Sequence, residues 1–235
     1  RDLATGQTRH YSCDFLISCT GYYDHKAGYL PEFPGVERYQ GQCVHPQHWP
    51  QDLDYSGKKV VVIGSGATAV TLVPAMAPQV GHITMLQRSP SYIMTVPAHD
   101  RITEMLCKVL PNDWVFGLAR KRNIAIQRWI FKAAKRWPEG TRRFLLKKVA
   151  EQLDDPSQMT HFTPSYMPWD QRLCAVPDGD LFKAINSGKA SVVTDEIDCF
   201  TESGIRLKSG AQLDADIIIT ATGLTLQVLG GTRML

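Results

Sequence analysis

Several patterns that would point to other classes of protein are missing from this sequence. Its six cysteines include no C-x-x-C pair, which argues against a zinc site, a redox-active dithiol or a disulfide framework and favours a reducing cytosol. No apolar run approaches the roughly 18 residues of a membrane span, and no signal-peptide pattern opens the chain. We therefore expect a cytoplasmic protein without a metal site.

Strong net charge is also missing, because the formal charge is only +3 and does not suggest a nucleic-acid partner. A content of 43% hydrophobic and 21% charged residues is typical of a globular protein, and 235 residues suffice for one large or two modest domains. The chain lacks an initial methionine and begins in a polar turn. This beginning predicts a piece of a longer protein.

The most informative stretch combines an apolar run with a glycine turn. Residues 60–63 are β-branched and apolar, as expected of a central parallel strand, and residues 67–76 continue as an apolar, alanine-rich helix. Between them lies G-x-G-x-x-A, in which the glycines permit a tight turn and close approach of a pyrophosphate to the backbone. The six residues predicted to bind a dinucleotide are Gly64, Ser65, Gly66, Ala67, Thr68 and Ala69.

An acidic residue is absent where an NAD site would have one. The next predicted strand, residues 82–86, is followed by Arg88 and Ser89, whereas an NAD site has an Asp or Glu for the ribose 2′-hydroxyl. An arginine can bind a 2′-phosphate through paired, charge-assisted hydrogen bonds, and a serine can add a hydroxyl. The sequence therefore predicts NADPH as the cofactor, the alternative being that Arg88 is only a solvated charge at a strand end.

Two segments near the ends of the chain share a pattern of aspartate, apolar strand and Thr-Gly. Residues 15–18, which we expect to form a buried strand after a hairpin arm, lead to Thr20 and Gly21, and residues 217–219 lead to Thr222 and Gly223. A strand that ends in Thr-Gly allows a ligand to approach the carboxyl edge of a sheet. We therefore predict that both Thr-Gly pairs contact a cofactor, although each could be an ordinary turn.

Between these segments lies a linker rich in proline, glycine and aromatic residues. It contains Tyr39, Gly41, His45, Trp49 and Pro50. We interpret it as an ordered segment that crosses from one domain to the next. The glycine would allow a tight bend, the histidine would form hydrogen bonds on both sides of its ring, and the tryptophan would anchor the segment by packing. No further ligand stands at metal-binding spacing, which argues against a metal role for the histidine.

The linker resembles the F-x-G-x-x-x-H-x-x-x-W-P fingerprint of type I Baeyer–Villiger monooxygenases, with Tyr in place of Phe, and flavin-containing monooxygenases are similar more broadly. The segments GSGATA, LQRSPSY, MPWDQR and ATGL also resemble this family. The resemblance implies an α/β fold: a Rossmann-like NADPH-binding domain over residues 51–223, with a helical insertion at about 101–157. Residues 1–50 and 224–235 would be flanking parts of a second, FAD-binding domain.

The predicted insertion carries half of the basic residues of the chain but few acids. Its lysines and arginines up to residue 150 are Arg101, Lys108, Arg120, Lys121, Arg122, Arg128, Lys132, Lys135, Arg136, Arg142, Arg143, Lys147 and Lys148. We favour a helical cap whose positive field attracts NADPH. The interleaved aromatic residues leave peripheral membrane contact as the alternative.

The resemblance also implies an activity and a catalytic residue. The W-D-Q-R match assigns the family's catalytic arginine to Arg172, which from the residues alone would be a surface or ion-pairing arginine. The implied reaction uses FAD, NADPH and O2 to insert oxygen into ketones or to oxidise sulfur and thioamide compounds. The N-terminal glycine fingerprint for FAD is absent, so we expect this chain to be inactive alone. The alternatives are a non-catalytic NADPH-binding fragment, an N- or S-oxygenating flavin-containing monooxygenase, or a flavin-dependent reductase.

Overall fold

A computed structural model describes residues 4–232 of the chain. The described residues divide into two compact units, one formed by residues 4–29 together with 224–232 and the other by residues 30–223. The linker at residues 30–50 belongs to the larger unit.

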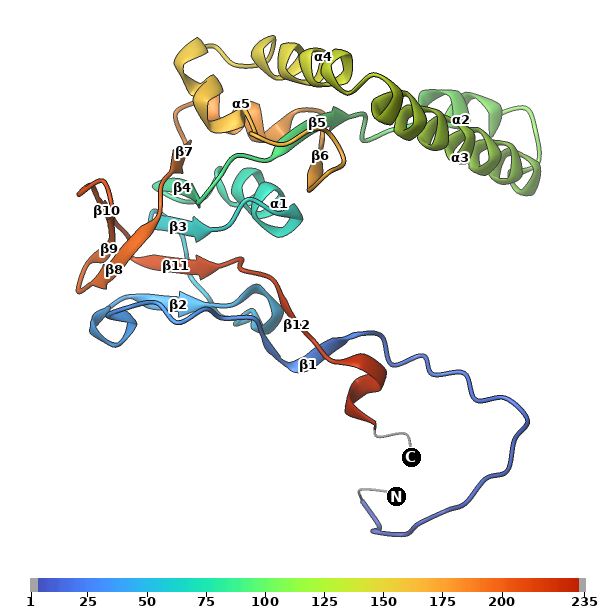
Figure 1. Cartoon of the computed structure of the whole chain (residues 1–235), viewed down its shortest axis with the longest axis horizontal. Coiled ribbons are helices and arrows are strands. Elements are labelled where there is room, and N and C mark those ends of the chain that lie inside the picture. Colours follow the sequence, from blue (N-terminus) through green and yellow to red (C-terminus); the bar gives the residue numbers. More distant parts are fainter. Residues whose placement is uncertain (1–3, 233–235) are drawn as a thin grey trace. The chain divides into compact units, whose positions relative to one another are not determined.

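A five-stranded parallel sheet forms the centre of the larger unit, in the order β2-β11-β3-β4-β7 (Figure 1). Its strands are β2 (Gln42–Val44), β3 (Lys59–Ile63), β4 (His82–Gln87), β7 (Ala190–Thr194) and β11 (Ile217–Thr220). The chain passes from β3 to β4 and then β7 on one side, whereas β11 pairs with β3 on the other. The crevice at which the strand order reverses therefore lies at the end of β3, the place where open α/β sheets bind ligands.

The central strand and the following helix have the local structure that their residues predict. Val60, Val61 and Val62 of β3 are at most 1% exposed, because the strand is covered on both faces. Helix α1 (Ala67–Met76) buries Ala69 and Val73 against the sheet. The predicted strand, glycine turn and helix are thus confirmed, and so is the α/β fold class.

A smaller antiparallel sheet joins β7 to β11. It contains β8 (Ile197–Thr201), β9 (Gly204–Leu207) and β10 (Gln212–Asp214), in the order β10-β9-β8. Phe200, Ile205 and Leu207 are buried in one apolar cluster with residues of β3 and β11. The small sheet consequently covers one face of the central sheet.

The connection from β4 to β7 contains two strands, four α-helices and the 3-10 helix η3 (Pro156–Phe162). Strand β5 (Tyr92–Val96) pairs in parallel with β6 (Leu173–Pro177), and helix α5 (Asp180–Asn186) leads into β7. Between the two strands lie α2 (Arg101–Leu106), α3 (Asn112–Arg136) and α4 (Pro138–Ala150). Helix α2 ends at Leu106, because the chain turns at residues 107–109.

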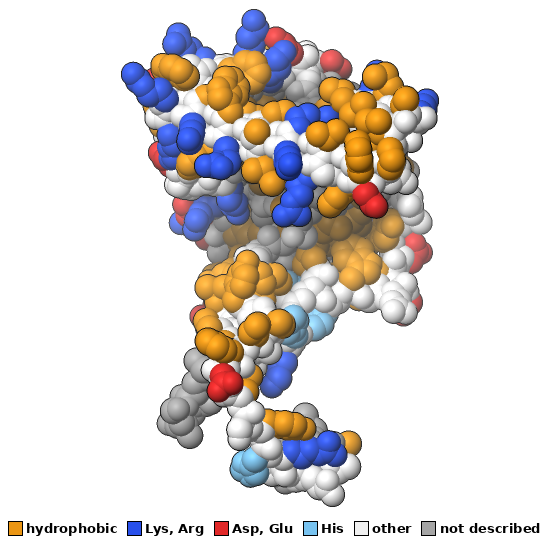
Figure 2. All heavy atoms as spheres, turned by 90° about the vertical axis from the view of Figure 1, so that its right-hand side faces the viewer, with side chains coloured by type: hydrophobic (Ala, Val, Ile, Leu, Met, Phe, Trp, Pro, Cys, Tyr) orange, Lys and Arg blue, Asp and Glu red, His pale blue; other side chains and the backbone are white. Residues whose placement is uncertain are grey.

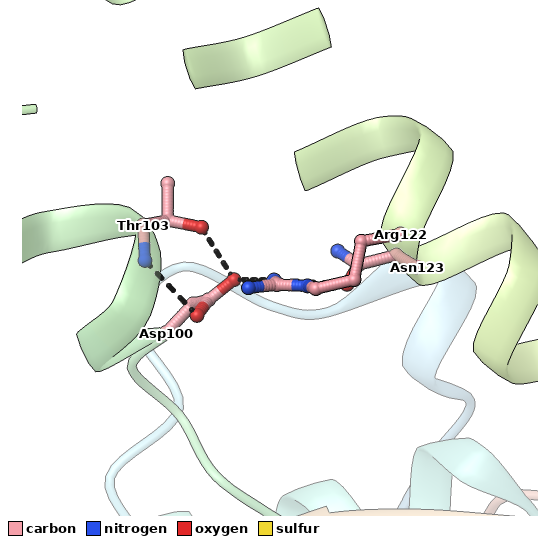
Figure 3. A network of polar contacts seen from close by, with 4 residues as sticks. All are labelled: Asp100, Thr103, Arg122 and Asn123. Carbon is pink, nitrogen blue, oxygen red and sulfur yellow. Dashed lines mark hydrogen bonds and ion pairs between the residues drawn. The ribbon is translucent and has the colours of Figure 1, made fainter. Parts of the chain in front are cut away.

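Helix α3 is exposed along most of its length, since only Val115 and Ala134 are buried. Its position beside α2 is secured by Asp100, which caps α2 by accepting hydrogen bonds from the amide (3.2 Å) and hydroxyl (2.6 Å) of Thr103. The same carboxylate accepts a hydrogen bond from Arg122 of α3 (Figure 3). Within residues 4–232, no helix has the length and hydropathy needed to span a bilayer.

The smaller unit contains strands β1 (Tyr23–Gly28) and β12 (Leu224–Leu226), which pair in an antiparallel ladder. Our expectation of a hairpin arm and a buried strand at residues 15–18 is wrong. This segment has no regular structure, and Phe15, Leu16 and Ile17 are each more than 80% exposed. The reason is that an apolar strand needs neighbouring strands for its backbone and side chains, and residues 4–232 supply none there.

Candidate nucleotide-binding site

The glycine turn after β3 lies very close to the backbone of the two neighbouring strands, β4 and β11. Gly64 has a φ of 136° and donates a hydrogen bond from its amide to the carbonyl oxygen of Leu86 (2.8 Å). A Cβ atom at this position would lie 2.5 Å from the carbonyl oxygen of Ala221, which follows β11. Glycine is therefore required here by both the backbone angle and the close approach.

Gly66 has a different role, because its φ of −83° is open to any residue. It caps α1 without a side-chain hydrogen bond, so the first amides of the helix have no side-chain cap and lie at the positive end of the helix dipole. A Cβ atom on Gly66 would meet only the Nη1 of Arg172, at 3.5 Å. Backbone amides of α1 and a guanidinium thus surround one small space, which suits a pyrophosphate.

Of the other residues of the turn, some are buried and some are exposed to solvent. Ser65 is buried and its hydroxyl lies 3.1 Å from that of Ser91, and Nη2 of Arg172 lies 3.5 Å from the same Ser65 oxygen. Ala69 is buried where α1 packs on the sheet, whereas Ala67 and Thr68 are exposed. The two exposed residues leave the start of α1 accessible to a ligand.

Arg88 and Ser89 follow the carboxyl end of β4, and both are exposed. The neighbouring strand β7 is in register, with Gln87 opposite Thr194. Gln87 is buried, and its amide nitrogen donates to the carbonyl of His161 (2.7 Å) and the hydroxyl of Thr194 (2.8 Å). This fixed Gln87 side chain anchors the strand end from which Arg88 projects.

His45 of the linker forms hydrogen bonds on both sides of its ring. Its Nδ1 accepts from the amide of Gln47 (3.2 Å), and its Nε2 lies 3.1 Å from the carbonyl oxygen of Gly223. This pairing assigns the proton to Nε2, which donates to Gly223. The histidine therefore ties the linker to the Thr222-Gly223 turn at the end of β11.

The remaining linker residues pack against the sheet. Tyr39 donates from its hydroxyl to the carbonyl of Ala215 (3.0 Å), and burial raises the pKa of this phenol. A Cβ atom on Gly41 would lie 2.5 Å from the carbonyl oxygen of Asp216, so a side chain has no room there. Trp49 packs against the core beside Tyr55, with ring centroids 6.4 Å apart, and the exposed Pro50 follows it.

The two Thr-Gly pairs lie in different units of the chain. In the larger unit, Gly223 has a φ of 105° and the hydroxyl of Thr222 lies 3.4 Å from the carbonyl of Thr220. In the smaller unit, Gly21 has a φ of 70° and Thr20 lies 3.1 Å from Ser18, hydroxyl to hydroxyl. The matching sequences thus adopt different structures, because only the second copy follows a strand of a sheet.

The loop that carries Arg172 is held by contacts that the sequence pattern did not reveal. Tyr166 donates from its hydroxyl to the Arg172 carbonyl (2.8 Å), and Asp170 forms an ion pair with Lys135 of α3 (2.6 Å). Trp169 has a φ of 64°, unusual for a bulky residue, and contacts the ring of Phe131 on α3. The insertion therefore supports the loop that brings Arg172 to the glycine turn.

The order of the sheet, the glycine turn at its switch point and the uncapped start of α1 are the features of an α/β fold of the Rossmann type. Residues 4–229 match the model of the flavin-binding monooxygenase-like family, and the chain belongs to that family.

Similar proteins come from mycobacteria among other sources. The chain is 64% identical to the putative FAD-containing monooxygenase MymA of Mycobacterium tuberculosis over 99% of its own length and 48% of that protein. It is 53% identical to the FAD-containing monooxygenase EthA of the same species over 94% of its length and 45% of the relative. The chain thus spans about half the length of these relatives.

A solved structure shows the same fold. It is the ε-caprolactone-bound crystal structure of cyclohexanone monooxygenase, with a TM-score of 0.69 at 22% identity. The match covers 89% of this chain and 48% of the other. At this identity the likeness supports the fold alone.

Proposed function

We propose that the chain is the NADPH-binding part of an FAD- and NADPH-dependent monooxygenase that uses O2 to oxygenate a small molecule. The observation that carries this proposal is the glycine turn of β3 and α1, with Arg172 across it and Arg88 at the end of the next strand. In this proposal residues 51–223 are the NADPH domain, residues 1–50 are a segment of an FAD domain together with the linker, and residues 224–235 return toward the FAD domain.

NADPH suits the residues at this site. The pyrophosphate would take hydrogen bonds from the first amides of α1, where Gly66 leaves room for its oxygens. Arg88 and Ser89 would bind the 2′-phosphate, because a guanidinium and a hydroxyl both donate to phosphate oxygens. Thr222 and Gly223, at the end of the adjacent strand β11, would line the same edge of the sheet.

FAD, the second proposed cofactor, fits the described residues less completely. Within residues 4–232 the G-x-G-x-x-A pattern occurs only between β3 and α1, so no residue is assigned to the FAD pyrophosphate. Thr20 and Gly21 remain proposed contacts of this cofactor. When bound, FAD would accept the hydride of NADPH and activate O2.

Arg172 is the proposed catalytic residue. Its guanidinium stays protonated at any working pH, so it can stabilise negative charge that develops on the reacting oxygen. On the same loop, the ring of Trp169 packs against α3 and Asp170 forms an ion pair with α3, and both contacts restrict the movement of the loop that carries Arg172. We propose that this support keeps the guanidinium directed at the cofactor edge of the sheet.

The proposed substrates are ketones, which would give esters or lactones. Trp49 and Pro50 favour this class, because they complete the linker pattern that resembles Baeyer–Villiger monooxygenases. Sulfur and thioamide compounds are the second candidate, since the same cofactors oxidise soft sulfur. A non-catalytic NADPH-binding fragment is the alternative outcome for this chain by itself.

The first test is a visible absorption spectrum of the chain purified with added FAD. A stoichiometric flavin band followed by NADPH consumption, with labelled O2 appearing in a lactone from cyclohexanone, supports the oxygenase. A colourless chain that binds NADPH supports the NADPH-binding fragment, and a chain that binds neither cofactor contradicts both proposals.

We propose that the basic insertion attracts anionic NADPH by its positive field. Figure 2 shows lysine and arginine side chains interleaved with hydrophobic ones on this part of the surface. Trp114 and Trp129 of α3 are 70% and 69% exposed. Co-sedimentation with anionic vesicles, if observed, would favour membrane contact instead.

A further inference from the structure

Two acidic residues flank the proposed 2′-phosphate site. Asp195 and Glu196 follow β7 as Arg88 and Ser89 follow the adjacent β4. The amide of Asp195 donates to the carbonyl of Gln87 (2.9 Å), which holds the two chain segments together. A carboxylate beside Arg88 would compete for its guanidinium and repel a bound phosphate, because both effects depend on nearby negative charge.

These acids have partners on the turn between β9 and β10. Lys208 forms an ion pair with Glu196 (Nζ to Oε2, 2.5 Å), and its amide donates to the Glu196 carbonyl (2.9 Å). Asp195 accepts hydrogen bonds from the amides of Glu196 (2.7 Å) and Ser209 (3.3 Å). The small antiparallel sheet thereby brings the positive charge of Lys208 to the two acidic residues beside the proposed 2′-phosphate site.

The electrostatics of Glu196 connect this pair to Arg88. The pKa of its carboxyl is lowered by Lys208 first and also by the charge of Arg88. Glu196 is therefore ionised at neutral pH, and Arg88 lies within its electrostatic reach. Removing Lys208 would leave this carboxylate free to pair with Arg88.

We propose that Lys208 is a specificity-determining residue, which neutralises Glu196 so that Arg88 can bind the 2′-phosphate of NADPH. This inference rests on the proposed function and extends it to a residue about 120 positions from Arg88 in the sequence. No part of the glycine turn or of the W-D-Q-R loop takes part in it.

The test compares NADP+ with NAD+, which differ only in the 2′-phosphate, by calorimetric titration of the whole chain. Lys208→Gln should weaken NADP+ binding by about threefold to tenfold, the scale of one partly exposed charge acting on a phosphate, with NAD+ nearly unchanged. Glu196→Gln should not weaken NADP+ binding, and the double variant should recover most of the loss. Added salt should reduce the effect, because exposed charges are screened.

Arg206→Gln is the matched control, because it removes the same charge from a similar ion pair on β9. Arg206 and Asp198 are 2.8 Å apart and 53% and 46% exposed, against 61% and 53% for Lys208 and Glu196. The assignment is overturned if Lys208→Gln changes the NADP+ to NAD+ ratio no more than this control, or if the double variant stays as weak as Lys208→Gln. A parent chain without preference for NADP+ would instead refute the proposed NADPH function itself.

Discussion

Replacing Gly66 or Gly64 with alanine separates two roles that the glycine turn combines. At Gly66 the φ of −83° is ordinary and a Cβ atom would lie 3.5 Å from its nearest neighbour outside the turn, which is normal van der Waals contact. We expect Gly66→Ala to cost about 1 kcal/mol or less in the free energy of unfolding, the scale of a weakened helix cap. The methyl group would nevertheless occupy space that a pyrophosphate needs, so NADP+ binding should weaken by about tenfold or more.

Gly64→Ala should behave in the opposite way. Its φ of 136° would strain an alanine by about 1–3 kcal/mol. The new Cβ atom would also lie 2.5 Å from the Ala221 carbonyl oxygen, where both β3 and β11 are buried, and overpacking of this kind costs a further ~1–3 kcal/mol. The free energy of unfolding should therefore fall by about 2–6 kcal/mol.

Urea unfolding of the two variants and the parent chain measures the stability difference, and calorimetric titration with NADP+ measures binding. The reasoning is refuted if Gly66→Ala binds NADP+ as tightly as the parent chain, or if it loses as much stability as Gly64→Ala. Equal stability of Gly64→Ala and the parent would show that β3 and β11 can separate without cost.

Three further predictions follow from the site and the insertion. Arg88→Gln should lower the preference for NADP+ over NAD+ by about one to two decades, because it removes a charge-assisted hydrogen bond to the 2′-phosphate. Competitive titration measures this preference, and an unchanged ratio of the two affinities would contradict the assignment of Arg88. Arg172→Ala, in the protein that contains this chain with its FAD part, should reduce the oxygenation rate by about 10²–10³, measured as product per unit time, and normal turnover would reject its catalytic role. Arg122 and Thr103 lower the pKa of Asp100 to about 2 from 3.8, so the stability that its charge contributes is present above pH ~4 and is lost as the pH falls toward ~2. In Asp100→Asn this pH-dependent contribution should be missing, so the melting temperature should fall less between pH ~4 and pH ~2 than in the parent chain. Identical profiles of melting temperature against pH would show that the contact does not affect stability.

Local sequence determined the strand, glycine turn and helix at residues 59–76, because the hydrophobic period and the glycines act on near neighbours. It also predicted which side chains could bind phosphate. It failed at residues 15–18, where an apolar run was expected to be a buried strand. The residues there have the right type, but a strand forms only when other strands pair with it.

Tertiary structure alone decided which distant residues meet. The order of the parallel strands brings Gly223 to His45, and the small antiparallel sheet brings Lys208 to Glu196, although neither pairing has a signature in the spacing of residues. The contact of Trp169 with Phe131 likewise depends on how α3 packs beside the loop of Arg172. The physical reason is that hydrophobic pattern specifies which face of an element is buried, whereas the choice of its neighbours depends on packing of the whole chain.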